Sequence, residues 1–120
     1  MEKLNCHCGQ IEIEVNLTKG LEDLYRCNCS MCKRKGAIST VIDKKDLKVT
    51  KGEELLKFYQ FNTNVAKHYF CSICGIYTHH HPRINPSLTG FNVGCIDSFD
   101  SFKFDKISVA DGKNHPLDKK

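Results

Sequence analysis

Three cysteines lie within six residues, in the segment Cys27-Asn28-Cys29-Ser30-Met31-Cys32. Zinc in a structural site is closed by four protein ligands, whereas zinc in a catalytic site keeps one position for water or substrate. Three thiolates from one loop therefore make a metal site that is one ligand short. Whether a fourth side chain closes this site decides between a structural and a catalytic role.

Four further cysteines form two short pairs, each followed by a glycine: Cys6 and Cys8, then Cys71 and Cys74. A tight turn lets both sulfurs of a pair face one metal, and glycine permits the backbone conformation that directs N–H groups at sulfur. We expect the two pairs to form one four-cysteine zinc site that clamps the first hairpin to the centre of the chain. The spacing also allows other partitions, such as Cys27 and Cys29 joining Cys71 and Cys74.

Disulfides or free thiols are the alternative to metal for these pairs. The first residues contain no apolar segment of the kind found in signal peptides, and no run of about 18 apolar residues is present. We therefore expect a cytoplasmic protein without membrane contact, in which cellular reductants keep thiols reduced. Eight cysteines in such a chain favour metal binding or catalysis.

The fourth ligand of the three-cysteine site has several candidates. Cys95 lies in an apolar segment, where a free cysteine usually packs as a small hydrophobic residue. His68 lies in an alternating segment typical of a strand, and His79 to His81 cannot all point to one side of a strand. A closed structural site and an open site therefore both agree with the spacing.

An open site with three thiolates would carry a net charge of −1, which makes zinc a weak Lewis acid. Sulfur-rich zinc favours a fourth thiol over water and lowers the pKa of that thiol, so that it is held as a thiolate at neutral pH. The simplest reaction of such a thiolate is addition to an aldehyde, which gives a hemithioacetal. Lys33, Arg34 and Lys35 follow the loop and could attract an anionic thiol such as glutathione, although a run of charges is more often a solvated face.

The elements that must position these cysteines are short strands. Ile11, Ile13 and Val15 alternate with polar residues, which is the period of a strand with one buried face. Further strands are predicted over 24–26, 37–42, 47–50, 55–61, 65–70 and 91–96, and an edge strand carries Phe99, Phe102 and Phe104. Ser30 is the expected cap of a helical turn over 31–35 that Gly36 ends. We predict an all-β domain of short antiparallel strands over residues 1–110, with metal sites in the turns, and a polar tail over 111–120.

The formal charge of +4 does not by itself indicate a nucleic-acid partner. Seven zinc-bound thiolates and two zinc ions would lower the formal charge to about +1, because coordinated thiols are deprotonated. Aromatic residues do not alternate with Lys and Arg, as they do on surfaces that stack single strands. We therefore do not expect nucleic acid as a partner.

Six segments between Cys6 and Ile96 form one pattern: Cys6–Gly9, Cys27–Ala37, Tyr59–Thr63, His68–His80, Arg83–Pro86 and Phe91–Cys95. This pattern resembles the family of glutathione-dependent formaldehyde-activating enzymes, which also contains centromere protein V. All seven cysteines of the family pattern are present in order.

The resemblance implies a mainly β fold of several coiled sheets, sometimes called a β-tent. It implies two zinc ions: a structural one on Cys6, Cys8, Cys71 and Cys74, and a catalytic one on Cys27, Cys29 and Cys32. It implies the chemistry of S-(hydroxymethyl)glutathione synthase, a carbon–sulfur lyase activity on a small thiol such as glutathione and an aldehyde such as formaldehyde. His79, His80, Arg83 and Asn85 also match family positions, where they could face a substrate or shape a loop.

Two other functions stay open at the level of the sequence. The first is a non-catalytic zinc-stabilised module that binds protein or nucleic acid, as the centromere relative suggests. The second is a metal–thiolate sensor. The sequence also leaves a homodimer open.

Overall fold

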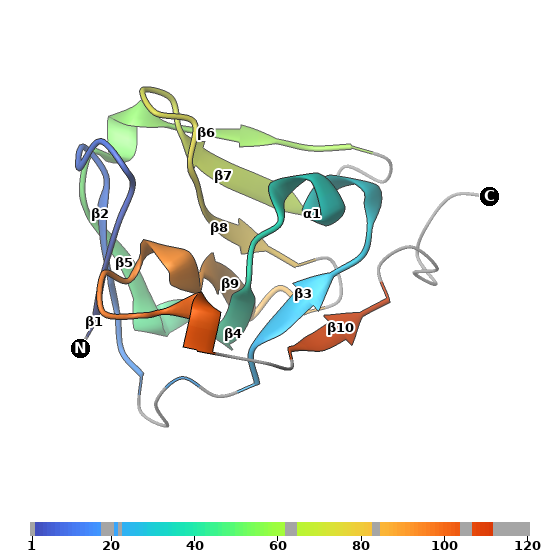
Figure 1. Cartoon of the computed structure of the whole chain (residues 1–120). Coiled ribbons are helices and arrows are strands. Elements are labelled where there is room, and N and C mark those ends of the chain that lie inside the picture. Colours follow the sequence, from blue (N-terminus) through green and yellow to red (C-terminus); the bar gives the residue numbers. More distant parts are fainter. Residues whose placement is uncertain are drawn as a thin grey trace.

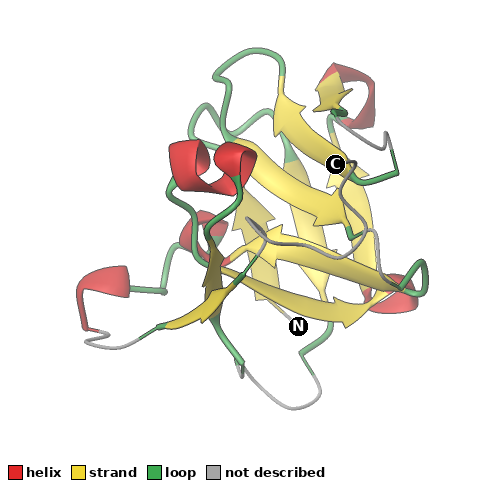
Figure 2. Cartoon of the chain, turned by 90° about the vertical axis from the view of Figure 1, so that its right-hand side faces the viewer, coloured by secondary structure: helices red, strands yellow, loops and turns green. Residues whose placement is uncertain are grey.

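Two β-sheets make up the framework of the protein (Figures 1 and 2). The computed structural model describes residues 2–17, 21, 23–61, 65–82, 85–103 and 107–111. Strands of the smaller sheet follow the order β1 (Glu2–Asn5), β2 (Glu12–Val15) and β5 (Leu47–Lys51). The seven strands of the larger sheet are, in order, β10 (Ser108–Ala110), β3 (Tyr25–Cys27), β4 (Ser39–Asp43), β9 (Leu88–Asn92), β8 (Tyr77–His81), β7 (Lys67–Cys71) and β6 (Leu56–Tyr59).

Neighbouring strands are antiparallel, apart from the parallel pair of β3 and β10. The helical segments are short and lie at the ends of strands (Figure 2). They are α1 (Ser30–Lys35) and the 3-10 turns η1 (Lys44–Asp46), η2 (Glu53–Leu55), η3 (Val93–Cys95) and η4 (Ser101–Lys103). The prediction of a mainly β fold of several sheets is confirmed.

The core confirms the alternation in the sequence of β2. Ile11, Ile13 and Val15 are completely buried, and they pack in one cluster with Phe91 and Val93 from the β9–η3 segment. The intervening residues of β2 are only partly buried, as the period of two predicts. This core joins the small sheet to the centre of the large one.

Three predictions about local structure are wrong. The strand expected over 91–96 ends at Asn92, because the Asn92 side chain accepts a hydrogen bond from the Gly94 N–H at 3.0 Å and starts a 3-10 turn. The edge strand expected at Phe99 to Phe104 is instead η4 over 101–103, where Phe102 is 95% exposed; Phe104 lies outside the described residues. The cap of α1 is Cys29 and not Ser30.

The predicted domain boundary falls at the end of the described chain. Asp111 follows β10, and the rest of the expected tail, residues 112–120, lies outside the described residues. None of the helices in the described part of the chain is long and apolar enough to cross a membrane.

Candidate metal centres and the pocket beside them

The first candidate centre joins the two sheets. Cys6 and Cys8 lie in the turn between β1 and β2, and Cys71 and Cys74 lie at the turn between β7 and β8. Figure 1 shows these two turns at the same end of the molecule. The four sulfurs all lie within 4.8 Å of one another. A metal held here would link the small sheet to the large sheet.

The two turns of this centre have the same construction. In each, a glycine adopts a positive φ, 79° at Gly9 and 78° at Gly75, which other residues rarely adopt. An N–H group points at the first sulfur of each turn: Ile11 N lies 3.3 Å from Cys6 Sγ, and Ile73 N lies 3.4 Å from Cys71 Sγ. These contacts fix the first sulfur of each turn relative to the backbone.

The sulfur–sulfur distances fit a zinc ion. Zinc–sulfur bonds of about 2.3 Å in a tetrahedron place the sulfurs about 3.8 Å apart. Cys6 Sγ lies 3.6 Å from Cys8 Sγ, and Cys8 Sγ lies 3.7 Å from Cys71 Sγ. A disulfide would require about 2.05 Å, and the cysteines are all free. The donor set therefore matches tetrahedral zinc and excludes disulfides within this group.

The second candidate centre is built by one short segment. Cys27 ends β3, Cys29 caps α1, and Cys32 lies in the first turn of the helix. The Cys29 sulfur accepts a hydrogen bond from the Cys32 N–H at 3.3 Å, as an N-cap side chain does. Gly36 ends the helix in the left-handed conformation with φ 64°. All three cysteines are partly exposed, so the centre is accessible from outside.

The three thiols of this centre do not ionise together on their own. Hydrogen bonding with Cys27, and then with Cys32, lowers the pKa of the Cys29 thiol. Hydrogen bonding with Cys29 raises the pKa of Cys27, and hydrogen bonding with Cys27 raises that of Cys32. One thiolate shared between two thiols is therefore favoured without a cation, whereas a divalent metal would stabilise all three as thiolates.

No fourth ligand joins these three thiols among the described residues, in which the cysteines form two separate groups. Cys95 is buried, and its thiol points at the Tyr77 carbonyl at 3.6 Å. His79 lies 2.8 Å from the Thr78 hydroxyl. Cys95 and His79 therefore have partners elsewhere in the sheet, and His68 contacts Lys35 of α1 at 3.0 Å.

The remaining predicted site residues are distributed as follows. His80 contacts the hydroxyl groups of Tyr25 and Tyr77 through its two ring nitrogens. Asn85 accepts hydrogen bonds from the backbone and side chain of Ser87, which shapes its own loop. Arg83 lies outside the described residues. Metal binding at the seven cysteines stays a prediction.

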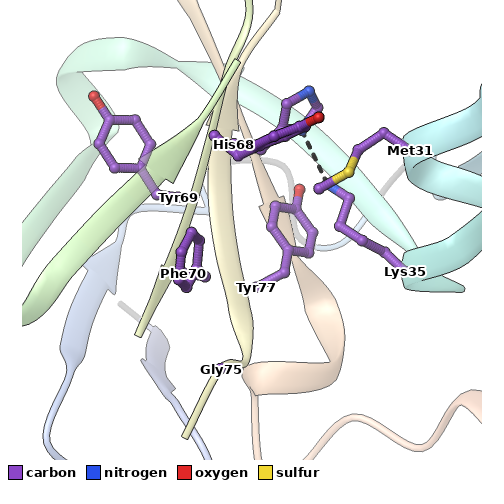
Figure 3. A pocket seen from close by; sticks show the side chains of 8 residues that line it. Met31, Lys35, His68, Tyr69, Phe70, Gly75 and Tyr77 are labelled. Atoms are coloured by element: carbon purple, nitrogen blue, oxygen red, sulfur yellow. Dashed lines mark hydrogen bonds between the residues drawn. The ribbon is translucent and has the colours of Figure 1, made fainter. Parts of the chain in front are cut away.

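A pocket of about 460 Å³ lies between α1 and the strands β6, β7 and β8 (Figure 3). Its lining consists of Met31, Lys35, Tyr59, His68, Tyr69, Phe70, Gly75 and Tyr77. Met31 and Lys35 come from α1, the helix that also carries Cys32, and Figure 3 shows both side chains directed toward the sheet. The second centre and the pocket therefore share one helix.

Lys35 differs from the two charged residues that precede it. The sequence suggested that the run Lys33 to Lys35 either attracts an anionic thiol or forms a solvated face, and Lys33 and Arg34 are exposed. Lys35 instead extends over the Tyr77 ring, with its Nζ 3.5 Å from the ring centroid. The available signal is its spacing, because residues three apart, such as Cys32 and Lys35, lie on one face of a helix.

Comparisons with known proteins agree with this arrangement. A model of the family described as glutathione-dependent formaldehyde-activating enzyme matches residues 1–109. The crystal structure of a Rhodobacter sphaeroides protein matches with a TM-score of 0.85 and 45% identity, over 90% of this chain and 99% of that one. A protein of Emericella nidulans, provisionally named as a glutathione-dependent formaldehyde-activating enzyme, is 29% identical over 94 residues. That match covers 75% of this chain and 47% of the relative, so the chain spans about half the length of that relative.

Proposed function

Because the chain belongs to the family of glutathione-dependent formaldehyde-activating enzymes, we propose that it is a zinc-dependent carbon–sulfur lyase that joins a small thiol to an aldehyde. The family name suggests glutathione and formaldehyde as the reactants. The observation that carries the proposal is the second centre: three accessible thiols without a fourth ligand among the described residues, on the helix that borders a pocket.

The two cysteine groups take different roles in this proposal. Cys6, Cys8, Cys71 and Cys74 form a closed set of four ligands, which is typical of structural zinc. Cys27, Cys29 and Cys32 form an incomplete set, which is typical of catalytic zinc. When bound there, zinc would hold the substrate thiol as a thiolate at neutral pH.

The residues of the chain supply position and access. The N-cap hydrogen bond to Cys29 fixes one sulfur relative to α1, and partial exposure leaves a path for a thiol. In the reaction, the substrate sulfur forms a bond to the aldehyde carbon, and the electron pair of the C=O double bond moves to the oxygen. The proton that the thiol loses ends on that oxygen, so the product is a neutral hemithioacetal.

The test compares the rate of hemithioacetal formation from glutathione and formaldehyde with the uncatalysed rate. We expect the zinc-loaded wild type to accelerate the reaction and Cys29→Ser to lose this acceleration, because Ser leaves two thiolates. Cys95→Ser is the matched control, since Cys95 lies in neither centre, and it should keep the acceleration. NMR exchange spectroscopy can measure both rates at equilibrium.

Equal rates with and without wild-type protein would reject the lyase proposal for this pair of reactants. Zinc content and lability then separate the alternatives. Two zinc ions that neither exchange nor bind glutathione would instead support a zinc-stabilised binding module. One inert ion and one ion that binds glutathione would keep the enzyme proposal and direct the search to another aldehyde.

A further inference from the structure

Lys35 places a positive charge in surroundings that are otherwise aromatic. Its Nζ lies 3.0 Å from His68 Nδ1 and 3.5 Å from the centroid of the Tyr77 ring (Figure 3). Burial lowers the pKa of this lysine, and the thiolates of Cys32, Cys29 and Cys27 act in the opposite direction. Burying an ammonium group costs free energy unless partners compensate for lost water. The position of Lys35 is therefore one that a solvated surface lysine would not adopt.

The partner of Lys35 is held rigidly. His68 is 6% exposed, and its ring stacks between those of Phe61 and His80, with centroids 5.8 Å away on each side. Since an ammonium has no acceptor, Nδ1 of His68 accepts the hydrogen bond from Lys35. Of the three ammonium N–H groups, one is directed at His68 and the Tyr77 face occupies a second. Since the described part of the chain provides no further partner, one donor is left for a group in the pocket.

The lining of the pocket indicates what that group is attached to. Met31, Tyr59, Phe70 and Tyr77 contribute apolar and aromatic surface. Among the described residues that line the pocket, Lys35 is the one from the Asp, Glu, Lys and Arg types. The volume of about 460 Å³ is in the range of pockets for small molecules and far exceeds what formaldehyde would fill. Glutathione carries two carboxylates and an ammonium, for which this lining offers few partners. A molecule with an apolar body and one oxygen-bearing end fits better.

We propose that this pocket binds the carbonyl reactant, and that this reactant is an aldehyde with an aromatic or branched apolar group whose oxygen accepts a hydrogen bond from Lys35. The inference rests on the proposed function and names its substrate class. Cys32 and Lys35 lie one helical turn apart on the same face, so the aldehyde carbon would lie between the thiol and the lysine.

Lys35 would then act on the reacting atoms directly. As the sulfur–carbon bond forms, the electron pair of the C=O bond moves to the oxygen, and the Lys35 N–H stabilises the charge that develops there. Lys35 transfers a proton to this oxygen and takes up the proton that the thiol releases. Atoms and charge balance over the cycle, and no further reactant is needed.

Binding of phenylacetate tests the inference without any turnover, because this acid has an aromatic body and an oxygen-bearing end but cannot react. Titrations followed by NMR should show that zinc-loaded wild type binds phenylacetate at least tenfold more tightly than acetate. Lys35→Met should weaken phenylacetate binding at least tenfold. Lys33→Met, which removes the same charge from an exposed position on the same helix, should leave it unchanged.

Equal phenylacetate affinity of Lys35→Met and Lys33→Met would overturn the inference, as would acetate binding as tightly as phenylacetate. If Lys35→Met loses zinc or fails to fold, binding to Tyr59→Ala provides the test instead. This variant should fold, because Tyr59 is half exposed at the pocket and its ring is not needed in the core. Tyr59→Ala should weaken the binding of phenylacetate but not that of acetate. Unchanged affinity for both acids would overturn the inference.

The same proteins separate this inference from the proposed function. Assays with phenylacetaldehyde and formaldehyde should give wild type a higher kcat/KM for phenylacetaldehyde. Tyr59→Ala should reduce this preference, whereas Lys35→Met should lower kcat/KM for both aldehydes. Phenylacetate binding without catalysis of either aldehyde would contradict the lyase proposal and leave the pocket's ligand class intact. Catalysis with formaldehyde alone, without phenylacetate binding, would contradict the pocket inference and leave the lyase proposal intact.

Discussion

Cys95 shows how the surroundings of a cysteine separate packing from metal binding. It is 5% exposed in η3, burial raises the pKa of its thiol to about 12, and its S–H points at the Tyr77 carbonyl. We expect Cys95→Ala to keep the full zinc content and to lose about 1 kcal/mol of stability, because a small buried group is removed. Metal analysis and urea unfolding measure the two effects.

Cys32→Ala is the matched comparison for that variant, since it removes the same atom from the three-thiol centre. It should lower the zinc content per chain by one ion while the remaining ion stays bound. A loss of zinc from Cys95→Ala equal to that from Cys32→Ala would show that Cys95 is a ligand, and the open-site proposal would then fail.

His79 makes the stability of the fold dependent on pH. Burial, followed by repulsion from His81, lowers the pKa of His79 from 6.5 to about 4. Below pH 6.5 the imidazole of His79 is therefore protonated in the unfolded chain but stays neutral in the folded chain. The free energy of unfolding consequently falls as the pH falls toward 4. This residue alone should contribute a slope that approaches about 1.4 kcal/mol per pH unit between the two pKa values.

Urea unfolding of wild type and His79→Asn between pH 6.5 and 5 measures this contribution. The variant should show the shallower dependence on pH, whatever its absolute stability, because Asn does not titrate. Protonation of the cysteine groups affects both proteins alike. Identical slopes would mean that His79 does not contribute to the pH dependence of stability in this range.

At the scale of elements, β8 and β9 approach each other closely where His80 faces Gly90. A Cβ atom on Gly90 would lie 2.6 Å from Nε2 of the His80 ring, which the hydroxyl groups of Tyr25 and Tyr77 hold in place. We expect Gly90→Ala to cost about 1–3 kcal/mol in the free energy of unfolding, as other overpacked sites do.

A double-mutant cycle with His80→Ala isolates this contact. Without the imidazole ring, the added methyl group has space, so Gly90→Ala should cost less in the His80→Ala background than in wild type. An unchanged cost would place the effect of Gly90→Ala in the backbone of β9 and not in its packing against His80.

The sequence could predict those elements that are determined by residues close to one another in the chain. The alternation of Ile11, Ile13 and Val15 predicted a half-buried strand, and the structure buries all three. The Asn92 side chain ends β9 through a hydrogen bond that competes with the sheet, which hydrophobicity does not reveal. β10 is a strand because it pairs with β3, which lies some 80 residues earlier in the chain.

The same distinction applies to the candidate site. The spacing within each cysteine pair and within the triplet is local, and it predicted metal sites. The spacing left open which pairs meet, because Cys8 and Cys71 are 63 residues apart in the chain, and the structure brings them together. The pocket depends on Lys35 meeting His68 and Tyr77, which come from strands that are distant in sequence. Charge patterning made Lys35 equivalent to Lys33. Helical spacing places Lys35 on the face of Cys32, but only the tertiary structure shows that this face borders a pocket.

At the scale of the whole molecule, the four-cysteine centre connects the two β-sheets, which share none of the described strands. The small sheet carries Cys6 and Cys8 at its β1–β2 turn, and the large sheet carries Cys71 and Cys74 at its β7–β8 turn. The three-thiol centre, by contrast, lies within one segment from β3 to α1. Loss of the first centre should therefore affect folding, whereas loss of the second should affect chemistry.

Cys74→Ser and Cys29→Ser test this division with the same substitution. Structural zinc supplies on the order of 10–16 kcal/mol of apparent binding free energy, which is comparable to the roughly 5–15 kcal/mol net stability of a domain. We expect Cys74→Ser to abolish cooperative thermal unfolding near the wild-type temperature. Cys29→Ser should unfold within a few degrees of wild type while it loses one zinc ion.

Circular dichroism melts, with zinc analysis of the same samples, give both quantities. A strong chelator should remove the metal of the three-thiol centre first. A closed set of four thiolates with N–H groups on its sulfurs releases metal more slowly than an accessible set of three. Activity should therefore disappear before the melting temperature changes. Simultaneous loss of activity and fold, or equal melting temperatures for the two variants, would contradict the assignment of separate roles, because both centres would then stabilise the molecule to the same extent.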